Sequence, residues 1–275
     1  MQVRYPPQSP LQTKTHRLKT ISFNLPGPGP WKITINSTLF ITAPVVVDGT
    51  SQAGFDGSFN RIYVEGASGV SSIFLLTSHA GTTIKGIGLY NYDNNGVTIW
   101  KDASWNFIDD DYIVFKKTAN GIVFNSLRAP SCAGVGIQGN YNKVRRTTIS
   151  GVYNGINVGE AIEKPTTGLV SHHNLFERNR IGTDPTGQTT VGYGNTSTGI
   201  FLGGTNVIAG STDNIGILIG NDAKNNGAWG NVIAGNRYAG LVVASGDGNW
   251  IWNNTIGLDN AQAQALGGQP SGHRP

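Results

Sequence analysis

The sequence predicts an all-β solenoid, in which short strands and turns stack coil upon coil. The first observation is a repeat of the form Asn, any residue, apolar, any, any, small polar, found at 174–179, 206–211, 231–236 and 249–254. The second is a glycine followed by an aliphatic run, found between these copies at 199–202, 216–219 and 240–243. The third is composition: charged residues make up only 13% of the chain, and 39 of its 275 residues are glycine, which is typical of turn-rich β proteins.

Each repeat unit is interpreted as strand, turn, strand. Aliphatic residues two apart suit strands with one face inward, and glycine and asparagine supply the left-handed backbone angles of tight corners. Such strands bury their apolar face only when coils stack about 4.8 Å apart into parallel sheets around a continuous core. Asparagines at the same place in successive coils are then expected to form a hydrogen-bonded ladder, which is a structural role.

Taken in order, residues 1–18 are polar and proline-rich, and we expect an irregular arm there. Residues 21–25 alternate like a strand and end at the proline and glycine breaker 26–30. Further strands are expected at 31–35, 45–47 and 61–66. These segments are expected to form the first coils.

From residue 70 to residue 160 the repeat is looser, but Asn106, Asn142 and, with threonine in its place, Thr82 begin the same pattern. Longer excursions at 159–167, 184–198 and 221–230 are expected to wall a groove, because loops of solenoids gather on one side. The repeat predicts one β-helix domain over 19–260, followed by a C-terminal tail at 261–275.

Four segments carry a family resemblance: ISFNLPG at 21–27, ITI at 33–35, VDGTSQAGF at 47–55 and NRIGTDPTG at 179–187. The chain resembles the large bacterial secreted proteins with right-handed parallel β-helix repeats, in the pectin-lyase-like superfamily. The resemblance implies a single right-handed parallel β-helix of about eight to ten coils and an extracellular or cell-surface location. The superfamily includes lyases, hydrolases, epimerases, phage tailspikes and adhesins, so the resemblance is specific for the fold and not for one activity.

Composition narrows the range of partners. The net charge is +4, but the basic residues are scattered, whereas a nucleic-acid-binding protein would carry a denser basic stripe with aromatic residues. Cys132 is the single cysteine, so no internal disulfide forms. Residues 1–20 lack the apolar core of a signal peptide, and no run is long enough to span a membrane. No polar cap is evident at the C-terminal end, which predicts a fragment or self-association through uncapped coil ends.

The candidate catalytic residues are a cluster of acids and the basic residues expected to stack on it: Asp109, Asp110, Asp111, Lys143, Arg145 and Arg146. In register, carboxylates would lie about 5 Å from guanidinium groups of the next coil, unless an extra coil lies between Asn106 and Asn142. Clustered carboxylates serve glycoside hydrolysis or bind calcium, which is the one cofactor this pattern suggests. Beside lysine or arginine they resemble lyase sites, where a cation neutralises a uronate and a base removes the adjacent proton. The alternative is an exposed charge ladder that sets the register of the coils.

The candidate substrate-binding residues are Tyr112, Glu177, Arg178, His173, Trp250 and Trp252. Trp250 and Trp252 flank Ile251 and would both point outward if Ile251 is in the core; interior stacking is the alternative. Adjacent His172 and His173 on a strand would point to opposite faces, so we expect them not to bind one metal ion together. One of them is a candidate general base; the alternative is that they form a pair at a corner, with one ring packed and the other in solvent. Other aromatic residues able to stack on sugar rings are Trp105, Tyr153, Tyr193, Trp229 and Tyr238.

These features predict an extracellular carbohydrate-active protein that binds an extended acidic polysaccharide along an outer groove and cleaves it by lyase or glycoside hydrolase chemistry. The net positive charge favours an acidic polymer. The alternative is a non-catalytic adhesin or structural β-helix module, favoured by the absence of the fuller sequence signatures of polygalacturonases, alginate epimerases and calcium-binding repeats. Ice binding would require a threonine pair in every coil, and the pairs at 82–83 and 147–148 are too sparse.

Overall fold

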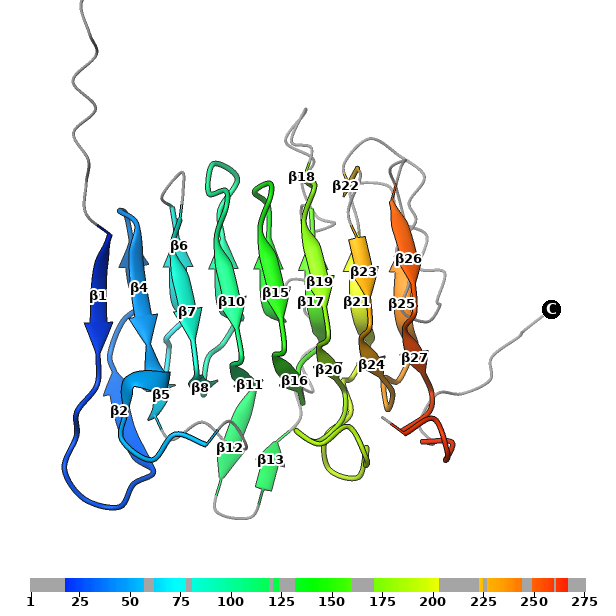
Figure 1. The fold of residues 1–275 in the computed structure, drawn as a ribbon, viewed down its shortest axis with the longest axis horizontal. Coiled ribbons are helices and arrows are strands. Elements are labelled where there is room, and N and C mark those ends of the chain that lie inside the picture. The colour runs from blue at the N-terminus through cyan, green and yellow to red at the C-terminus, as the bar shows by residue number, and fades with distance from the viewer. Residues whose placement is uncertain are drawn as a thin grey trace, which may run out of the picture.

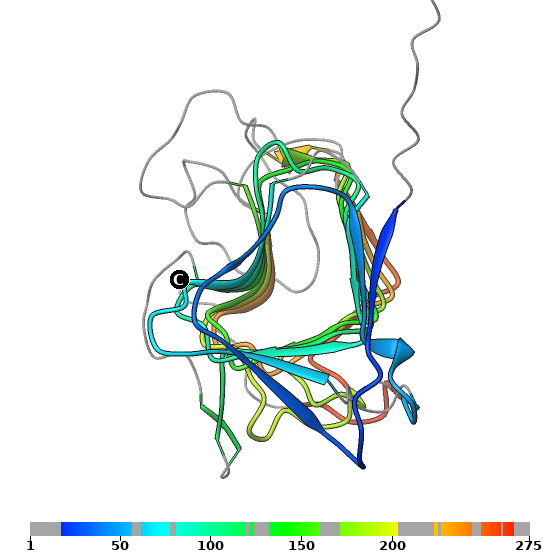
Figure 2. The same ribbon diagram turned by 90° about the vertical axis from the view of Figure 1, so that its left-hand side faces the viewer.

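The protein is a right-handed parallel β-helix with three sheets, here called A, B and C (Figures 1 and 2). The chain passes from sheet A to sheet B to sheet C and then returns to sheet A one coil further along. The computed structural model describes residues 18–56, 62–77, 81–118, 121–123, 132–159, 171–202, 223–224, 227–243, 249–259 and 261–266. The fold class predicted from the sequence is confirmed. Among the described residues, sheets A and B each have eight strands, which agrees with the expected eight to ten coils.

Each sheet is built from one strand per coil. Sheet A consists of β1 (Lys19–Ser22), β4 (Val45–Asp48), β7 (Thr83–Lys85), β10 (Phe107–Asp109), β15 (Lys143–Arg145), β19 (Leu175–Glu177), β23 (Gly227–Trp229) and β26 (Trp250–Trp252). Sheet B consists of β2 (Trp31–Ile35), β5 (Ile62–Gly66), β8 (Ile87–Tyr90), β11 (Tyr112–Val114), β16 (Thr148–Ser150), β20 (Arg180–Ile181), β24 (Val232–Ile233) and β27 (Thr255–Ile256). Sheet C consists of β3 (Leu39–Ile41), β6 (Ser72–Leu76), β9 (Asn95–Ile99), β14 (Ala133–Ile137), β17 (Asn154–Val158), β21 (Thr198–Leu202) and β25 (Ala239–Val243).

A few elements lie outside the three sheets. Strands β12 (Lys116–Thr118) and β13 (Gly121–Val123) form an antiparallel hairpin, β18 (Ser171–His172) pairs with β22 (Ala223–Lys224), and η1 (Gly49–Ser51) is one turn of 3-10 helix. The hairpin accounts for part of the long interval between Asn106 and Asn142. Since β10 pairs directly with β15, no extra coil separates them in sheet A. No helix among the described residues is long and apolar enough to cross a membrane.

The first strand differs from its predicted position. The alternation at 21–25 predicted a strand there, whereas β1 ends at Ser22. Beyond it, the backbone N–H groups of Phe23 and Leu25 donate to the side chains of Ser51 and Gln52 at 2.7 and 2.8 Å. Side-chain acceptors of the following turn therefore replace a neighbouring strand for these residues. The assignment of 19–260 to one domain, with a tail at 261–275, stays a prediction.

The core is formed by one inward side chain from each of the six sheet A strands β4 to β23, together with the matching aliphatic residues of sheets B and C. In sheet A these are Val47, Ile84, Ile108, Val144, Phe176 and Ala228, each 5% exposed or less. They belong to one continuous cluster that extends along the helix. Because side chains alternate along a strand, burial of Ile108 turns its neighbours Phe107 and Asp109 to the outer face.

A column of glycines in sheet C explains the repeated glycine followed by an aliphatic run. Gly134, Gly155 and Gly199 occupy the second position of strands in successive coils. A Cβ on Gly155 would lie 2.4 Å from the carbonyl oxygen of Gly199 and 2.4 Å from Cγ2 of Ile181 in sheet B. Only a residue without a side chain allows the two sheets to approach this closely.

Asparagines form two hydrogen-bonded ladders, one before sheet A and one before sheet B. In the first, the backbone N–H groups of Asn106 and Asn142 donate to the side-chain oxygen of the next asparagine, at 3.0 and 2.9 Å. In the second, Asn179 donates in the same way to Asn231 at 2.9 Å. The predicted ladder is confirmed, but placing 231–236 in the same slot as 174–179 was wrong, because Asn231 precedes β24 of sheet B. The copies at 206–211 and 216–219 lie outside the described residues.

Candidate functional site

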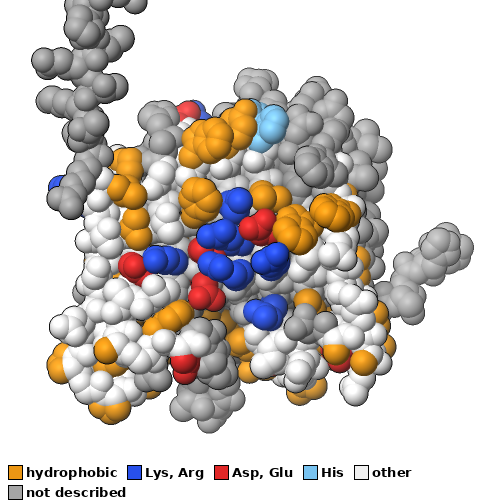
Figure 3. Space-filling model, in the orientation of Figure 1, with side chains coloured by type: hydrophobic (Ala, Val, Ile, Leu, Met, Phe, Trp, Pro, Cys, Tyr) orange, Lys and Arg blue, Asp and Glu red, His pale blue; other side chains and the backbone are white. Residues whose placement is uncertain are grey.

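One outward-facing column crosses sheet A from strand to strand. Its members, each at the last position of its strand, are Asp48, Lys85, Asp109, Arg145, Glu177, Trp229 and Trp252. The sign of the charge alternates over the first five, and two tryptophans follow. Figure 3 shows this face, with acidic and basic side chains gathered over the middle of the sheet. The register of Asp109, Arg145 and Glu177 expected from the sequence is confirmed.

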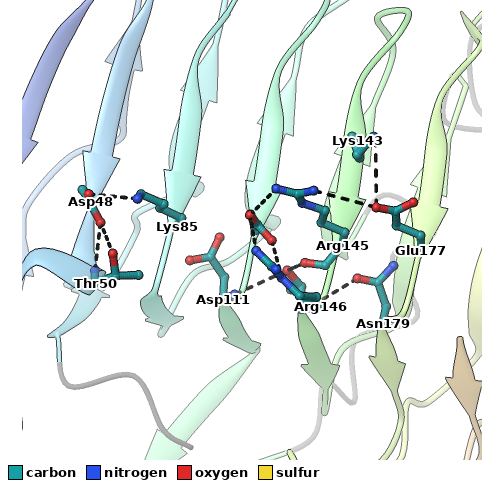
Figure 4. A network of polar contacts seen from close by, with 11 residues as sticks. Asp48, Thr50, Lys85, Asp111, Lys143, Arg145, Arg146, Glu177 and Asn179 are labelled. Carbon is teal, nitrogen blue, oxygen red and sulfur yellow. Dashed lines mark hydrogen bonds and ion pairs between the residues drawn. The ribbon is translucent and has the colours of Figure 1, made fainter. Parts of the chain in front are cut away.

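Two arginines hold the carboxylate of Asp109. Arg145 Nη2 donates to Oδ2 at 2.8 Å, while Arg146 donates from Nε to Oδ1 at 3.0 Å and from Nη2 to Oδ2 at 2.7 Å. The Asp109 side chain is only 6% exposed, whereas that of Arg146 is 51% exposed. Figure 4 shows Arg145 and Arg146 directed toward the same carboxylate. Forked contacts between guanidinium and carboxylate fix both partners in direction as well as distance.

Glu177 extends the ionic network by one coil. Its Oε1 lies 3.9 Å from Arg145 Nη1 and 4.0 Å from Lys143 Nζ. Its other oxygen, Oε2, accepts a hydrogen bond from Trp229 Nε1 at 3.2 Å. Glu177 therefore joins the cationic part of the column to its aromatic part.

Trp229 and Trp252 form the aromatic part. Their ring centroids are 5.7 Å apart at an interplanar angle of 22°, and the Arg178 guanidinium lies 5.1 Å from the Trp229 ring. Trp252 is 59% exposed, so its predicted outward position is confirmed. Trp250 lies in β26, and its side chain is outside the described part of the structure.

An open cavity of about 630 Å³ lies on the sheet beside the arginine pair. Its lining residues are Val46, Thr50, Thr83, Lys85, Phe107, Asp109, Asp110, Arg145 and Arg146. Lys85 Nζ is 2.9 Å from Asp48 Oδ2, which holds this cation at the cavity. Both signs of charge and one aromatic ring thus face a space large enough for a sugar residue.

Asp110 is the half-buried acid of the cavity. It occupies the corner after β10 with a φ of 58°. Burial raises the pKa of its carboxyl, Arg146 opposes the rise and the Asp109 charge adds to it. A carboxyl with a raised pKa is a stronger base once ionised and a usable acid when protonated.

Asp111 does not line the cavity with its two neighbours. It stands in the corner ladder of sheet B, where its Oδ1 accepts the backbone N–H of Ile87 at 2.7 Å. The residue is 3% exposed, and burial raises the pKa of its carboxyl well above the ordinary value. Its expected catalytic role stays a prediction, but its contacts are those of a structural residue.

Tyr112 lies on a different sheet from the column. It is in β11 of sheet B, half-buried against Tyr63, Tyr90 and Val114. Burial raises the pKa of its hydroxyl. The structure therefore does not bring Tyr112 together with the sheet A residues predicted to bind substrate.

His172 and His173 contact each other, contrary to the expectation that they point to opposite faces. Their Nδ1 atoms are 2.7 Å apart. The reason is that β18 ends at His172 and His173 adopts a left-handed φ of 55°, so strand alternation does not apply to it. His173 stacks on Tyr141 at the edge of sheet A where the strands begin, away from the acid and arginine cluster.

The structure adds Asp48, Lys85 and Phe107 to the predicted site, and it places Trp229, one of the aromatic residues expected to be able to stack on sugars, in the same column. A signal for Lys85 was present in the sequence, because Thr82 and Asn106 occupy the same position of the repeat. The third residue after Thr82 is Lys85, and the third residue after Asn106 is Asp109. The place of Trp229 in the column had no such signal, because the sequence assigned 221–230 to an excursion, whereas residues 227–229 form β23 of sheet A. Only the strand pairing shows that Asp48 and Phe107 belong to this face of sheet A.

Calcium does not fit the acidic cluster as it stands. Both oxygens of Asp109 accept hydrogen bonds from guanidinium groups, whereas calcium takes six to eight oxygen ligands. Among the described residues, no group of three or more His, Cys, Asp or Glu side chains is placed to hold a metal ion. We therefore assign no metal ligands.

The chain is similar to two solved structures of polysaccharide lyases. One is the alginate lyase from Paenibacillus sp. str. FPU-7, with 17% identity, coverage of 87% of this chain and 90% of that chain, and a TM-score of 0.44. The other is the pectate lyase Pel9A, with 15% identity, coverage of 90% of this chain and 72% of that chain, and a TM-score of 0.36. No protein-family model matches the chain, and no curated protein does. Likenesses at this level assign no function to the chain.

Proposed function

We propose that the protein is a carbohydrate-active protein that binds an extended acidic polysaccharide across the outer face of sheet A and cleaves it at the cavity beside Asp110. The observation that carries the proposal is the convergence of Lys85, Arg145 and Arg146 on one open cavity. The stacked tryptophans Trp229 and Trp252 continue the same column. Cations to pair with uronate carboxylates and rings to stack on sugars are therefore combined on one surface.

Binding relies on arginines that are already oriented. Asp109 and Glu177 hold Arg145 between them, and Asp109 also holds Arg146. Arg145 and Arg146 keep 34% and 51% of their side chains exposed, so both remain accessible to an incoming carboxylate. Preorganised side chains lose less conformational entropy when a ligand binds.

β-Elimination is the cleavage reaction that this arrangement favours. Asp110, as the carboxylate, takes the proton from the ring carbon next to the uronate carboxyl, and the arginines stabilise the negative charge that develops on that carboxyl. The electron pair forms a carbon–carbon double bond as the bond to the neighbouring sugar's oxygen breaks. That oxygen takes a proton from water. The products are a new reducing end and an unsaturated uronate.

A non-catalytic binding or structural module is the second candidate, and one observation favours it. The acids of the column are already paired with cations: Asp48 with Lys85, Asp109 with both arginines, and Glu177 with Arg145 and Lys143. Such pairing is also what a charge ladder that fixes the coil register would show. In that case the cavity binds polymer without breaking it.

The test is incubation with pectic, alginate, xylan, glucan and glycosaminoglycan polymers, followed by assays of new reducing ends and of ultraviolet absorbance from unsaturated uronates. We expect both signals with an acidic polymer, and a loss of turnover of about 100-fold or more in Asp110→Asn. Asp102→Asn, an exposed acid outside the cavity lining, is the matched control. Reducing ends without absorbance would replace elimination by hydrolysis. No product from any polymer would leave the binding module as the function.

An extracellular or cell-surface location is part of the same proposal, because an extended polysaccharide does not cross a membrane to reach a protein inside the cell. Fractionation of the producing cells tests it. Recovery of the protein only from the interior would contradict it.

A further inference from the structure

A second aromatic column lies at the edge of sheet A where the strands begin. Trp105 and Tyr141 occupy the corner before β10 and β15, and His173 occupies the corner before β19. The Trp105 and Tyr141 rings are 4.5 Å apart and parallel within 2°, and the Tyr141 and His173 rings are 4.9 Å apart. Both spacings match the distance of about 4.8 Å between neighbouring strands, so the rings stack because their coils do.

The corner itself does not require these aromatic residues. Trp105, Tyr141 and His173 have left-handed φ angles of 60°, 57° and 55°, which bulky side chains rarely adopt. In the preceding coil the equivalent position is Gly81, with a φ of 81°, the residue that such a corner favours. The rings are nevertheless exposed, Trp105 by 53% and Tyr141 by 37%. Exposed stacked aromatic residues in a strained backbone conformation indicate a binding surface.

Gly81 ends the stack one coil before Trp105. Each of the next three coils places a ring in this column. Because Gly81 has no side chain, no ring of the described residues covers the outer face of the Trp105 indole in this column. A Cβ built on Gly81 would lie 3.8 Å from Pro44 Cβ, an ordinary van der Waals distance. A flat ring bound at this step would continue the spacing of the stack.

We propose that the step between Gly81 and Trp105 is a second carbohydrate-binding site, which takes an uncharged pyranose ring by stacking on the Trp105 indole. The apolar CH face of a pyranose has the shape and polarity that an indole face accepts. Trp105 and Asp109 are four residues apart in the sequence, so their Cα atoms are at most about 14 Å apart. Phe107 lies between them, and the ion pairs of Asp109 are at the far end of β10. Stacking on the indole therefore selects a sugar by its ring face.

Titration calorimetry with cellohexaose and xylohexaose tests the site. We expect wild-type protein to bind at least one of these neutral oligosaccharides and Trp105→Ala to bind it about tenfold more weakly. Phe40→Ala, which removes another exposed aromatic residue, 64% exposed on β3 of sheet C, is expected to bind like wild type. Equal affinity in Trp105→Ala and wild type, or no binding of either oligosaccharide by wild type, would overturn the proposal.

A second pair of variants tests the step itself. Gly81→Tyr places a ring against Trp105, so we expect binding to be lost although Trp105 is still present. Tyr141, at the equivalent corner two coils further along, shows that tyrosine adopts a left-handed φ there. Gly81→Ala carries the same backbone strain without the ring and should still bind. Thermal melting confirms that each variant is folded. Retained binding in folded Gly81→Tyr would contradict the site.

The site stands independently of the proposed cleavage at Asp110. Loss of neutral oligosaccharide binding in Trp105→Ala, together with no cleavage of any polymer, would leave this site intact and remove the enzyme. Cleavage of an acidic polymer, with neutral oligosaccharide binding that is unchanged in Trp105→Ala, would do the reverse.

Discussion

Asp111 shows how one residue serves folding although its sequence neighbours suggest catalysis. It stands in the ladder position that asparagine occupies at Asn179, Asn231 and Asn254. Its Oδ1 makes the ladder bond, but its buried Oδ2 has no hydrogen-bond partner among the described residues. The hydrogen bond from Ile87 only partly offsets the desolvation cost of an ionised carboxylate there. Burial therefore raises the pKa of Asp111 well above the ordinary value of 3.8.

Asp111→Asn is expected to stabilise the protein at neutral pH by about 1 to 3 kcal/mol. Asparagine keeps the acceptor for Ile87 and removes the titratable group. Because the folded pKa of Asp111 lies above its unfolded value, the folded state binds the proton more tightly, and wild-type stability falls as pH rises between the two values. The advantage of the variant should therefore vanish below about pH 3.9, grow as pH rises, and level off above the folded pKa.

Denaturant unfolding of both proteins over a range of pH values measures this difference. Asp109→Asn is the contrasting variant, because Asp109 is paired with two arginines and its loss should destabilise the protein. A stability difference between Asp111→Asn and wild type that does not change with pH would show that the carboxyl is not the cause.

At the scale of the element, the corner ladders bind one coil to the next. Asn179 accepts the backbone N–H of Thr147 at 3.1 Å and donates from Nδ2 to Val144 and to Asn231 at 2.9 and 3.0 Å. It is fully buried. Asn254 makes similar bonds at the last coil of the sheet, but it is only partly buried. The same residue type in the same column therefore faces different amounts of water.

Asn179→Ala is expected to destabilise the fold by about 3 kcal/mol, because it leaves the buried Thr147 N–H without its acceptor and removes the hydrogen bonds to Val144 and Asn231. Asn254→Ala is expected to cost less, since water reaches its partners. Paired chemical unfolding experiments measure both free energies. An equal loss in the two variants would indicate that the ladder acts through coil geometry rather than through satisfaction of buried polar groups.

At the scale of the whole molecule, sheet A carries two surfaces with different chemistry. The cavity gathers Lys85, Arg145 and Arg146 and is suited to a charged polymer. The edge with Trp105 and Tyr141 is aromatic. Since charge attraction is screened by salt and ring stacking is much less affected, the two surfaces should respond differently to ionic strength.

Raising the ionic strength from about 0.05 to 0.5 M should weaken binding of an acidic polysaccharide severalfold or more, because the Debye length falls below the size of the cavity. Binding of cellohexaose or xylohexaose should change little over the same range. Calorimetric titration of both ligands with one protein sample measures the two responses. Acidic polymer binding that is insensitive to salt would contradict the cationic cavity as its site.

Association of copies through the coil ends stays a prediction at this scale. Strands β1, β2 and β3 are the first strands of their sheets. Ile21 and Phe40 on these strands are 49% and 64% exposed. Sedimentation over a range of concentrations measures whether the protein self-associates.

Several features of the site could be predicted from the sequence alone, because they depend only on the position of each residue within its repeat. Stacked coils place equivalent positions side by side, so aligning the repeats already put Asp109 beside Arg145 and Arg145 beside Glu177. The same alignment offered Lys85 as their neighbour. The position of Trp229 in this column could not be found in this way, because the repeat pattern is not legible over 221–230, which the sequence assigned to an excursion although it contains β23.

The sequence by itself determined the parallel stacking, the inward aliphatic columns and the charged column on the outside, since all three depend on the period of the strand and on the spacing of the coils. Only the tertiary structure decided where the corner side chains lie. Asp110 lines the cavity while Asp111 is buried in a ladder, and His173 turns back to meet His172. At these corners the backbone leaves the extended region, so side-chain direction no longer alternates. It depends instead on contacts with coils that are distant in the sequence.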